Sequence, residues 1–574
     1  EAGFHTDAVA TLPAGADIAL AEQEAAMRLQ PFEGRLLQAR LVPESGDRGR
    51  RLLLVIHHLA IDGVSWRIVM NELAALWQEF ANATEPPPPP STFRGWALGL
   101  RDAAGSPAVV GEIPYWRGVL DAPTISFASG PLVAARDRVA VVNRMTISLT
   151  PVETRSLLTA PGRLNLKIHE LLLTALLMAA RRTAQSNDGG LRIDVEGHGR
   201  EDVIAGIDAG QTVGWFTSLF PAVLSGPPGN GAAEFPALLR SVKQAMRTIP
   251  ANGVGFGLLR YLNESEGQAL RDAATPEICF NYLGRFSDGV GSWLPASEHA
   301  ALGIFRDPDM ATAHAIEVLA HIRDDRSGPV FTIEWAWAPD IVAGSTVETL
   351  ARSWDDALRS QLDFASRDDV RPILTPADLP LVKLPQAEID GLAARRPQLE
   401  DILPLTSLQE GLLFHTLYDD EGDDTYLVQL VLRLGGQVDP VRLRASCAAL
   451  VARHAILRSC FEHQGHDRPI QIVSSSIDLC WEELRIADAH EEQAWLASNQ
   501  ARRFDPAHPP LVAFTLLRRD DGTSLLVLSL HHLLLDGWSI PVVIRDLAAL
   551  YDGIGLPPAV PHRRFLEWLA AQDQ

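Results

Sequence analysis

Two copies of one histidine-rich signature have the residue types and spacing of a site that moves protons. The first runs from His57 to Gly63 as HHLAIDG, and the second runs from His531 to Gly537 as HHLLLDG. An imidazole titrates near neutral pH, so it can accept or donate a proton under ordinary conditions. The repeat predicts a duplicated domain in which each copy carries a proton-handling site.

The residues within each signature are expected to have separate roles. Neighbours on a strand point to opposite faces, so His57 and His58 cannot easily share a metal ion. One of them should face a channel, and the other should pack behind it. A single histidine at the end of a strand would more often be a hydrogen-bonded core residue. Asp62 lies in a tight Asp-Gly turn, where it would orient the site or brace the backbone. The counterparts in the second copy are His531, His532 and Asp536.

Regular elements on both sides of each signature would position it. An apolar run that is typical of a strand precedes each copy, at 52–56 and 525–530. After each copy, apolar side chains recur with the spacing of one face of a helix. The matched positions are Val69, Leu73, Leu76 and Trp77 in the first copy and Val543, Leu547, Leu550 and Tyr551 in the second. Each signature is therefore expected on a strand-to-helix turn.

Further polar motifs follow predicted strands in the first part of the chain. The run Glu196–Glu201 (EGHGRE) comes after a strand at 191–195, and its glycines leave the polar side chains unshielded, although a solvated charged turn would look the same. Asn281 and Tyr282 offer an amide and a phenol, or else a hydrogen-bonded strand end with a packed ring. The glycine-rich run 253–257 lacks the preceding strand and following helix of a dinucleotide- or phosphate-binding loop.

Composition and charge narrow the class of protein. A chain of 574 residues is too long for one ordinary core, so two or more domains are expected. The net charge of −22 argues against binding to nucleic acid or to an anionic membrane. The longest apolar helical stretch, Leu171 to Ala180, is too short to span a bilayer. The four cysteines lack CxxC spacing, so we expect neither a zinc site nor disulfides, and a reducing cytoplasm fits best.

Strand and helix patterns alternate along the chain, which predicts α/β layers. Strands are expected at 141–149, 191–195 and 330–337, and helices at 168–182 and 346–364. A proline-rich, charged stretch at 376–400, with a short helix at Gln386–Arg396, is predicted to link a first domain, 1–375, to a second, 401–574. The second copy has far more chain ahead of its histidine pair than the first. We therefore expect the first domain to lack its opening segment and the second to hold only its beginning.

These motifs resemble those of a known family. Four motifs in residues 1–375 occur in the order of the core motifs of epimerization domains in nonribosomal peptide synthetases: His57–Arg67, Glu196–Glu201, Thr212–Thr217 and Phe280–Gly284. The second copy is similar to the start of a condensation domain, which is a related domain type. Its matching motifs are Leu403–Gly411, Arg453–Arg458 and His531–Gly537.

The resemblance implies an α/β fold like that of chloramphenicol acetyltransferase. This fold is a two-lobed pseudo-dimer with a tunnel through its cleft, nearly complete in the first domain and represented by only the N-terminal lobe in the second. The implied activity is L-to-D epimerization at Cα of an aminoacyl or peptidyl thioester, coupled to peptide-bond formation. The chain itself would bind no cofactor, because the phosphopantetheine arm of a carrier protein would bring the substrate. Carrier protein domains upstream and downstream, and other synthetase modules, would be the partners.

The resemblance also implies roles for single residues. His58 and Glu196 would flank the tunnel from different lobes and exchange the Cα proton, and His532 would orient or deprotonate the attacking amine in the second domain. The residues expected to hold the thioester or to stabilise its enolate are Arg200, Asn281 and Tyr282. The chain departs from the usual family pattern at His169-Glu170, Cys279 and Arg285, where Asn-Asp, Ser and Gln are more common.

The order of the two domains carries a further expectation. A condensation domain that directly follows an epimerization domain should accept a D-configured donor and an L-configured acceptor. Two other classes of function are alternatives: a carrier-docking module without turnover, and a free-standing acyltransferase that uses His58 alone. The acyltransferase leaves Glu196 and the pair Asn281–Tyr282 without a role.

Overall fold

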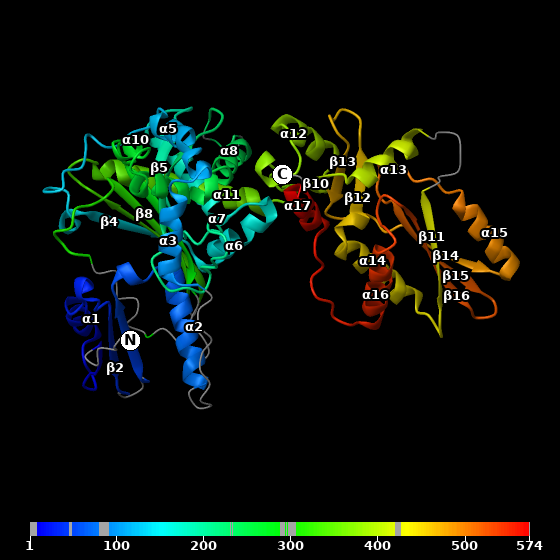
Figure 1. Cartoon of the computed structure of the whole chain (residues 1–574), viewed down its shortest axis with the longest axis horizontal. Coiled ribbons are helices and arrows are strands. Elements are labelled where there is room, and N and C mark those ends of the chain that lie inside the picture. The colour runs from blue at the N-terminus through cyan, green and yellow to red at the C-terminus, as the bar shows by residue number, and fades with distance from the viewer. Residues whose placement is uncertain are drawn as a thin grey trace. The chain divides into compact units, whose positions relative to one another are not determined.

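The computed structural model divides the chain into two compact units, Glu1–Ile373 and Leu374–Gln574 (Figure 1). The residues that it describes are 8–44, 49–79, 91–229, 231, 234–286, 293, 296, 306–325, 327–418 and 426–572. Both units combine β-sheets with helices packed against them, which confirms the predicted α/β class. In the described part of the chain, no helix has the length and apolar content needed to cross a bilayer.

The first unit begins with a small sheet that carries the first signature. Its strands are β1 (Val9–Thr11), β2 (Leu37–Val42) and β3 (Arg51–Ile56), in the order β1-β2-β3, and α1 (Ile18–Met27) packs on β2 and β3. Strand β3 ends directly before His57, and helix α2 (Gly63–Glu79) begins after Asp62. The signature therefore lies on a strand-to-helix turn, as the sequence predicts.

The rest of the first unit is built on a six-stranded mixed sheet. In spatial order its strands are β4 (Asn143–Ser148), β9 (Gly328–Trp337), β8 (Ile316–Asp325), β7 (Ile278–Phe286), β5 (Leu191–Gly197) and β6 (Ser218–Leu224). Strand β7 runs parallel to β5 and to β8, and the other neighbours are antiparallel. The strands predicted at 141–149, 191–195 and 330–337 correspond to β4, β5 and β9.

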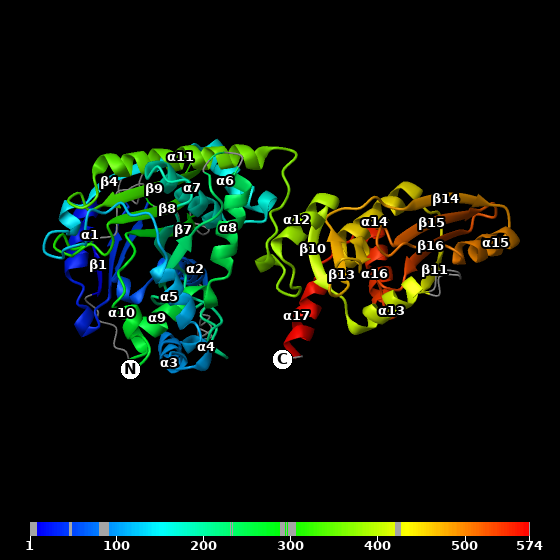
Figure 2. The ribbon, with the colours of Figure 1, turned by 90° about the horizontal axis from the view of Figure 1, so that it is seen from above.

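Helices cover one face of this sheet and supply the core of the unit. They are α6 (Pro151–Leu164), α7 (Ile168–Thr183), α8 (Phe235–Arg247) and α11 (Gly344–Ser366), which Figure 2 shows side by side. Leu171 to Ala180 of α7 are all buried, because this helix is enclosed by the sheet, α8 and α11. Shorter helices complete the unit: α3 (Phe93–Ala103), α4 (Pro107–Val110), α5 (Ile113–Asp121), α9 (Val254–Gly257) and α10 (Gln268–Arg271).

The second unit repeats the strand-to-helix arrangement around the second signature. Its four-stranded sheet has the order β11 (Leu427–Leu434), β16 (Ser524–His531), β15 (Val512–Arg519) and β14 (Trp481–Ile486). Strand β16 ends at His531, and α16 (Ser539–Asp552) follows. A second sheet has the order β10 (Leu399–Pro404), β13 (Ile470–Ser474) and β12 (Ser459–Glu462). Further helices of this unit are α13 (Ser407–Tyr418), α14 (Pro440–Arg453), α15 (Ala489–Gln500) and α17 (His562–Gln572).

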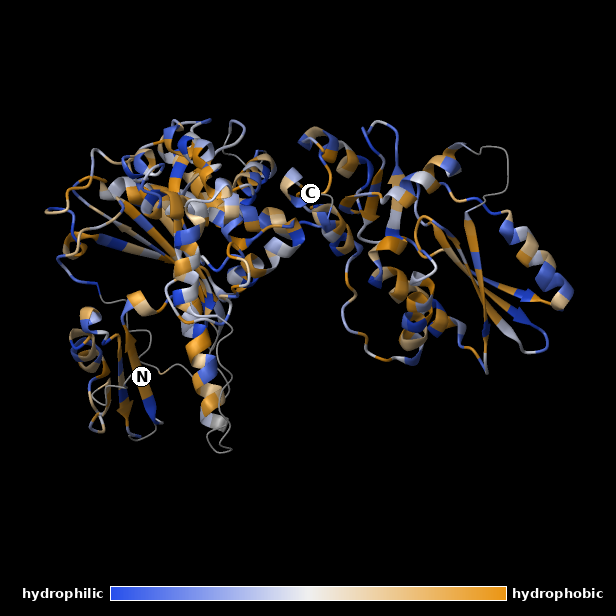
Figure 3. Ribbon diagram, viewed as in Figure 1, coloured by the Kyte–Doolittle hydropathy of each residue, from blue (hydrophilic) through white to orange (hydrophobic). Residues whose placement is uncertain are grey.

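The stretch 376–400, which the sequence predicts to be a linker, is instead packed into the second unit. Its helix α12 (Gln386–Arg395) buries Ile389 and Leu392 against Ile402 and Ile470 of the three-stranded sheet. The prolines and charged residues of this stretch favour a linker, but its apolar residues are packed in the core of the second unit. In both units, hydrophobic residues are concentrated along the strands, as the hydropathy colouring of Figure 3 shows.

Candidate active site

The two histidines of the first signature have different environments. His57 Nδ1 accepts a hydrogen bond from the Leu59 N–H at 3.2 Å, which caps the short helical turn His58–Ala60. The ring of His58 is exposed and lies 4.6 Å from the ring of Trp215, centroid to centroid. His57 therefore fixes the backbone of the turn, and His58 presents its imidazole to the segment that carries Trp215.

The second signature folds in the same way. The buried His531 accepts a hydrogen bond on Nδ1 from the Leu533 N–H at 3.1 Å, as His57 does in the first unit. His532 Nδ1 lies 2.8 Å from the carbonyl oxygen of Leu535. A carbonyl can only accept, so His532 must carry its proton on Nδ1 and keep Nε2 free of it when neutral.

Asp62 forms a buried ion pair that joins the small sheet to the large one. Its carboxylate is 3.1 Å from Nη2 of Arg200, and both side chains are 5% exposed or less. Asp62 also accepts hydrogen bonds from the backbone N–H groups of Ser65 (2.7 Å) and Phe216 (3.1 Å). Burial alone would raise the pKa of Asp62, but these N–H groups, the Ser65 hydroxyl and the Arg200 charge together hold it below its usual range.

Both terminal nitrogens of the Arg200 guanidinium donate hydrogen bonds, to Asp62 and to neighbouring residues. Nη2 also donates to the hydroxyl of Ser65 (2.8 Å), and Nη1 donates to the carbonyls of Ala209 (2.5 Å) and Thr212 (2.7 Å). The guanidinium lies over the Phe216 ring, 4.1 Å from the centroid. The sequence predicts that Arg200 holds the thioester or stabilises its enolate, and that role stays a prediction. In the structure its terminal nitrogens hold the segment 209–216, which includes Trp215.

In the second unit Asp536 has a simpler role. Its carboxylate accepts from the backbone N–H (2.8 Å) and the hydroxyl (2.7 Å) of Ser539, at the start of α16. The Ser539 hydroxyl is the main reason that the pKa of Asp536 lies below its usual value. Asp62 thus caps the helix that follows its signature and in addition binds an arginine, whereas Asp536 fixes the turn that leads into α16.

Glu196 lies on the face of the large sheet that is opposite to the hydrophobic side of β5. Ile193 and Val195 point into the helix-covered core, so alternation places Glu196 on the other face. The register pairs Val195 with Phe280 of β7, which puts Asn281 beside Glu196. Asn281 Nδ2 donates a hydrogen bond to Glu196 Oε2, and Cys279 Sγ lies 4.0 Å from Oε1.

The surroundings of Glu196 favour its protonated form. Burial is the main reason that the pKa of Glu196 is raised, and the nearby Glu317 carboxylate raises this pKa further. Positive charge on His314, Arg306 and His58 opposes this rise. A carboxyl group whose pKa moves up toward neutrality can act as an acid as well as a base.

The fold brings His58 and Glu196 to the same region. Trp215, which contacts His58, lies three residues before Ser218, where β6 begins. Ser218 pairs with Gly197, the residue after Glu196 on β5. The charge of His58 also influences the pKa of Glu196, so the imidazole is within electrostatic reach of the carboxyl group.

Tyr282 is separated from this group although it is adjacent to Asn281 in sequence. Strand alternation turns its side chain to the opposite face of β7, where it packs against the helix-covered core. Burial raises the pKa of Tyr282 to about 12. The structure therefore brings Asn281 to Glu196 and gives Tyr282 a place in the packing of the sheet.

The departures from the usual family pattern at His169-Glu170 and Arg285 have structural explanations. Glu170 accepts from the Lys167 N–H (2.7 Å) at the start of α7 and pairs with Arg247 (2.8 Å). Burial lowers the pKa of His169 to about 4, so this imidazole is neutral at neutral pH. Arg285 pairs with Asp324 of β8 at 2.8 Å.

The departure at Cys279 gives a testable prediction, because this side chain touches Glu196. A serine hydroxyl donates a stronger hydrogen bond than a thiol, and such a bond favours the ionised carboxylate. Cys279→Ser should therefore lower the pKa of Glu196, by about one unit or less. A ¹³C-carboxyl NMR titration measures this directly, with Cys480→Ser in the second unit as the control. An unchanged titration would show that the thiol has no influence on the carboxyl group.

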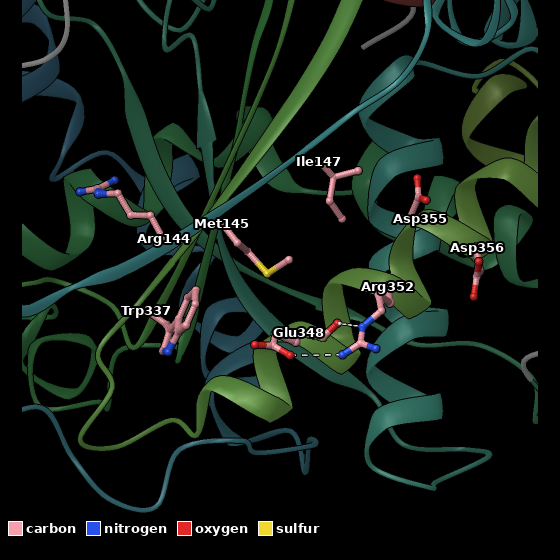
Figure 4. A pocket seen from close by; sticks show the side chains of 8 residues that line it. All are labelled: Arg144, Met145, Ile147, Trp337, Glu348, Arg352, Asp355 and Asp356. Carbon is pink, nitrogen blue, oxygen red and sulfur yellow. Dashed lines mark hydrogen bonds and ion pairs between the residues drawn. The ribbon is translucent and has the colours of Figure 1, made fainter.

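A separate hollow lies elsewhere on the surface of the first unit. It has a volume of about 590 Å³ between β4 and α11, with Met145, Trp337 and Arg352 among its lining residues (Figure 4). Strands β9, β8 and β7 separate β4 from β5, which carries Glu196. This hollow is therefore distinct from the site around His58 and Glu196.

Comparison with known proteins places this geometry in a family. The model of the condensation domain family matches residues 13–305 and 399–574, so the chain belongs to that family, and both units contain part of the match. The chain carries epimerization-domain-like and condensation-domain-like regions of a nonribosomal peptide synthetase, as the resemblance implied. The fold like that of chloramphenicol acetyltransferase is also confirmed.

Individual relatives support this assignment. The chain is 35% identical to one of the linear gramicidin synthase proteins of Brevibacillus parabrevis, over 97% of this chain and 7% of that protein. It is 32% identical to chondramide synthase cmdD of Chondromyces crocatus, over 95% of this chain and 15% of that protein. The chain thus spans a small part of these relatives. A crystal structure of the epimerization domain from the third module of tyrocidine synthetase B matches with a TM-score of 0.54 and 27% identity, covering 62% of this chain and 80% of that one.

Proposed function

We propose that the first unit epimerises the α-carbon of an aminoacyl or peptidyl thioester, from L to D, while a carrier protein holds the substrate on its phosphopantetheine arm. The observation that carries this proposal is that the first unit brings an exposed imidazole, His58, within electrostatic reach of a half-buried carboxyl group, Glu196, whose pKa is raised. The similarity to a solved epimerization domain supports it.

The chemistry requires a proton to leave one face of Cα and another to arrive at the opposite face. The thioester carbonyl makes the Cα proton acidic, because the enolate that forms is delocalised. A positioned acid–base group supplies about 10²–10⁴-fold in rate, and two such groups serve the two faces. His58 and Glu196 would fill these roles, and Asn281 would hold the Glu196 carboxyl group in place.

In the second unit, the histidine signature supplies a side chain that can assist amide formation, His532. His532 keeps Nε2 available, because Nδ1 donates to the Leu535 carbonyl. In this proposal Nε2 orients the acceptor amine or takes its proton as the amine attacks the donor thioester. The partners would be the carrier proteins that bring the donor and the acceptor, together with other synthetase modules.

The proposed activity is tested with the chain and carrier proteins loaded with a panel of L-aminoacyl and L-dipeptidyl groups. After release of the thioester, chiral chromatography should detect the D-epimer at Cα of the terminal residue. No D-epimer from any member of the panel, with no exchange of the Cα proton, would contradict the proposal and favour a docking module without turnover.

Because the condensation unit follows an epimerase unit, we predict that the complete synthetase module consumes a D-configured donor. In a reconstituted assay, a carrier-bound D-donor and an L-acceptor should give amide product at least tenfold faster than the matched L-donor, since a misplaced substituent on Cα, next to the reacting carbonyl, costs about 1–3 kcal/mol. The epimerase must be inactivated by Glu196→Gln so that the two donors do not interconvert. Consumption of the L-donor alone would overturn this prediction.

A further inference from the structure

Trp215 has no role in the chemistry described so far, although its side chain contacts His58. The indole ring lies 4.6 Å from the imidazole, centroid to centroid, and the two ring planes are tilted by 49°. Trp215 is 43% exposed, whereas its neighbours Gly214 and Phe216 are buried. Tryptophan is on average a highly buried residue, so an exposed indole ring beside the proposed base needs an explanation.

The segment that carries Trp215 is fastened to the turn of the first signature. The Gly214 N–H donates to the Ser65 hydroxyl (3.1 Å), and the same hydroxyl donates to the Gly214 carbonyl (2.9 Å). The Phe216 N–H donates to Asp62 Oδ2 (3.1 Å). Asp62 ends the turn and Ser65 lies in the first turn of α2, so the indole ring cannot move away from the signature without breaking these bonds.

Packing restricts the same segment further. A Cβ atom on Gly214 would lie 2.4 Å from Cδ2 of Phe93, which is closer than packed side chains approach. The Phe216 ring packs against the rings of Phe93 (5.2 Å) and Trp96 (5.7 Å), measured between centroids. Trp215 therefore has fixed neighbours on both sides, and its ring is held in place beside the imidazole.

The two signatures hold their second histidine in different ways. In the second copy, Nδ1 of His532 lies 2.8 Å from the Leu535 carbonyl oxygen, so a hydrogen bond holds the ring and occupies one nitrogen. Ile61 is the counterpart of Leu535 in the first copy. Within the residues that the structure describes, the ring of His58 makes no hydrogen bond, and Trp215 supplies a ring contact. Such a contact restrains an imidazole without occupying either nitrogen.

We infer that Trp215 is a positioning residue for His58: the indole ring fixes the orientation of the imidazole, and both imidazole nitrogens stay available for proton transfer. This inference rests on the proposed function, in which His58 exchanges a proton with Cα of the substrate. A reacting group must be held close to its productive geometry, and a misplacement of about 1 Å can cost about 10²-fold in rate. An exposed imidazole without a neighbour would instead move among several rotamers.

The ring contact can be measured without turnover, from the NMR signals of the His58 ring protons, assigned by their absence in His58→Ala. The ring current of a nearby indole shifts these signals. Trp215→Leu should therefore remove that shift, and Trp215→Phe should keep part of it. Trp77→Leu changes another exposed tryptophan of the first unit and is the control that should leave the signals in place. Signals that Trp215→Leu also leaves in place would overturn the inference.

The positioning role is tested by the kinetics of D-epimer formation from a carrier-bound L-aminoacyl thioester. Trp215→Leu should lower kcat by about 10–10²-fold with little change in KM, and Trp215→Phe should restore most of the rate. A raised KM with an unchanged kcat would mean that Trp215 only binds substrate, which overturns the inference. In the background of His58→Ala, Trp215→Leu should cause no further loss, because Trp215 acts through the imidazole. A further tenfold loss in this double variant would also count against the inference.

The two measurements separate this inference from the proposed function. If Trp215→Leu moves the His58 signals while the wild-type chain forms no D-epimer and exchanges no Cα proton, the proposed function fails and the contact that fixes the imidazole remains. If the wild-type chain forms the D-epimer and Trp215→Leu keeps its kcat, the positioning role fails and the proposed function remains.

Discussion

Glu196→Gln and His58→Ala are each expected to lower the rate of Cα proton exchange on a carrier-bound thioester by about 10²–10⁴-fold, the usual contribution of one acid–base group. Glutamine keeps the size of Glu196 and a polar contact for Asn281, but it cannot take up the proton. Alanine removes the imidazole and its contact with Trp215. Mass spectrometry of the thioester after incubation in deuterated water measures the exchange.

A matched control is available in the same motif. Glu201 pairs with His198 at 3.3 Å and accepts from Asn252 at 2.9 Å, so Glu201→Gln changes a carboxyl group outside the proposed chemistry. This variant should keep exchange within a few-fold of the wild-type rate. Full retention of D-epimer formation together with full retention of exchange in Glu196→Gln or in His58→Ala would remove that residue from the mechanism.

Asp62→Ala is expected to have the largest effect on stability, about 3–5 kcal/mol in the free energy of unfolding of the first unit. The variant leaves the Arg200 charge buried without its partner and removes an acceptor from the Ser65 and Phe216 N–H groups. Glu348→Ala is the control: its pair with Arg352 is more than half exposed on both sides, so its loss should cost less than about 1 kcal/mol.

Activity should fall together with stability, because the Asp62–Arg200 pair holds the segment with Trp215 against His58. Hydrogen–deuterium exchange of peptides from 49–79 and 198–217 should show both segments less protected in Asp62→Ala. Unchanged protection and an unchanged unfolding free energy would mean that the pair does not join the two sheets.

The same pair sets a pH dependence whose sign follows from its environment. The pKa of Asp62 in the folded chain lies below the value of about 3.9 for an unfolded aspartate, so its contribution is complete above that pH. It is lost as the pH falls through the lower, folded-state pKa. The stability difference between wild type and Asp62→Ala should therefore narrow in strong acid.

Local patterns in the sequence were sufficient to predict the strands and helices that carry the two histidine signatures. The apolar run and the helical stripe on either side of each signature placed His57 and His531 at strand-to-helix turns. The repeated signature predicted that both copies fold alike, and the hydrogen bonds of His57 and His531 agree with that. These features depend on the periodicity of neighbouring residues, which one sequence displays directly.

The contacts within the site depend on pairings that one sequence does not display. Asn281 reaches Glu196 because β7 lies beside β5 in one parallel register, and the same register turns Tyr282 away. Arg200 contacts Asp62, 138 positions earlier in the chain, and no local pattern indicates that contact. Trp215 lies within a recognised motif, but its contact with His58 follows from the fold alone.

The pattern of deuterium labelling at early times tests the two-base account most directly. Wild-type chain is incubated in deuterated water with a carrier-bound L-aminoacyl thioester, and both epimers are recovered and analysed separately. If His58 and Glu196 serve opposite faces of Cα, the new D-epimer should carry one solvent-derived deuterium while the remaining L-epimer is still unlabelled. Equal labelling of both epimers from the first time point would mean that a single group serves both faces, which contradicts the account.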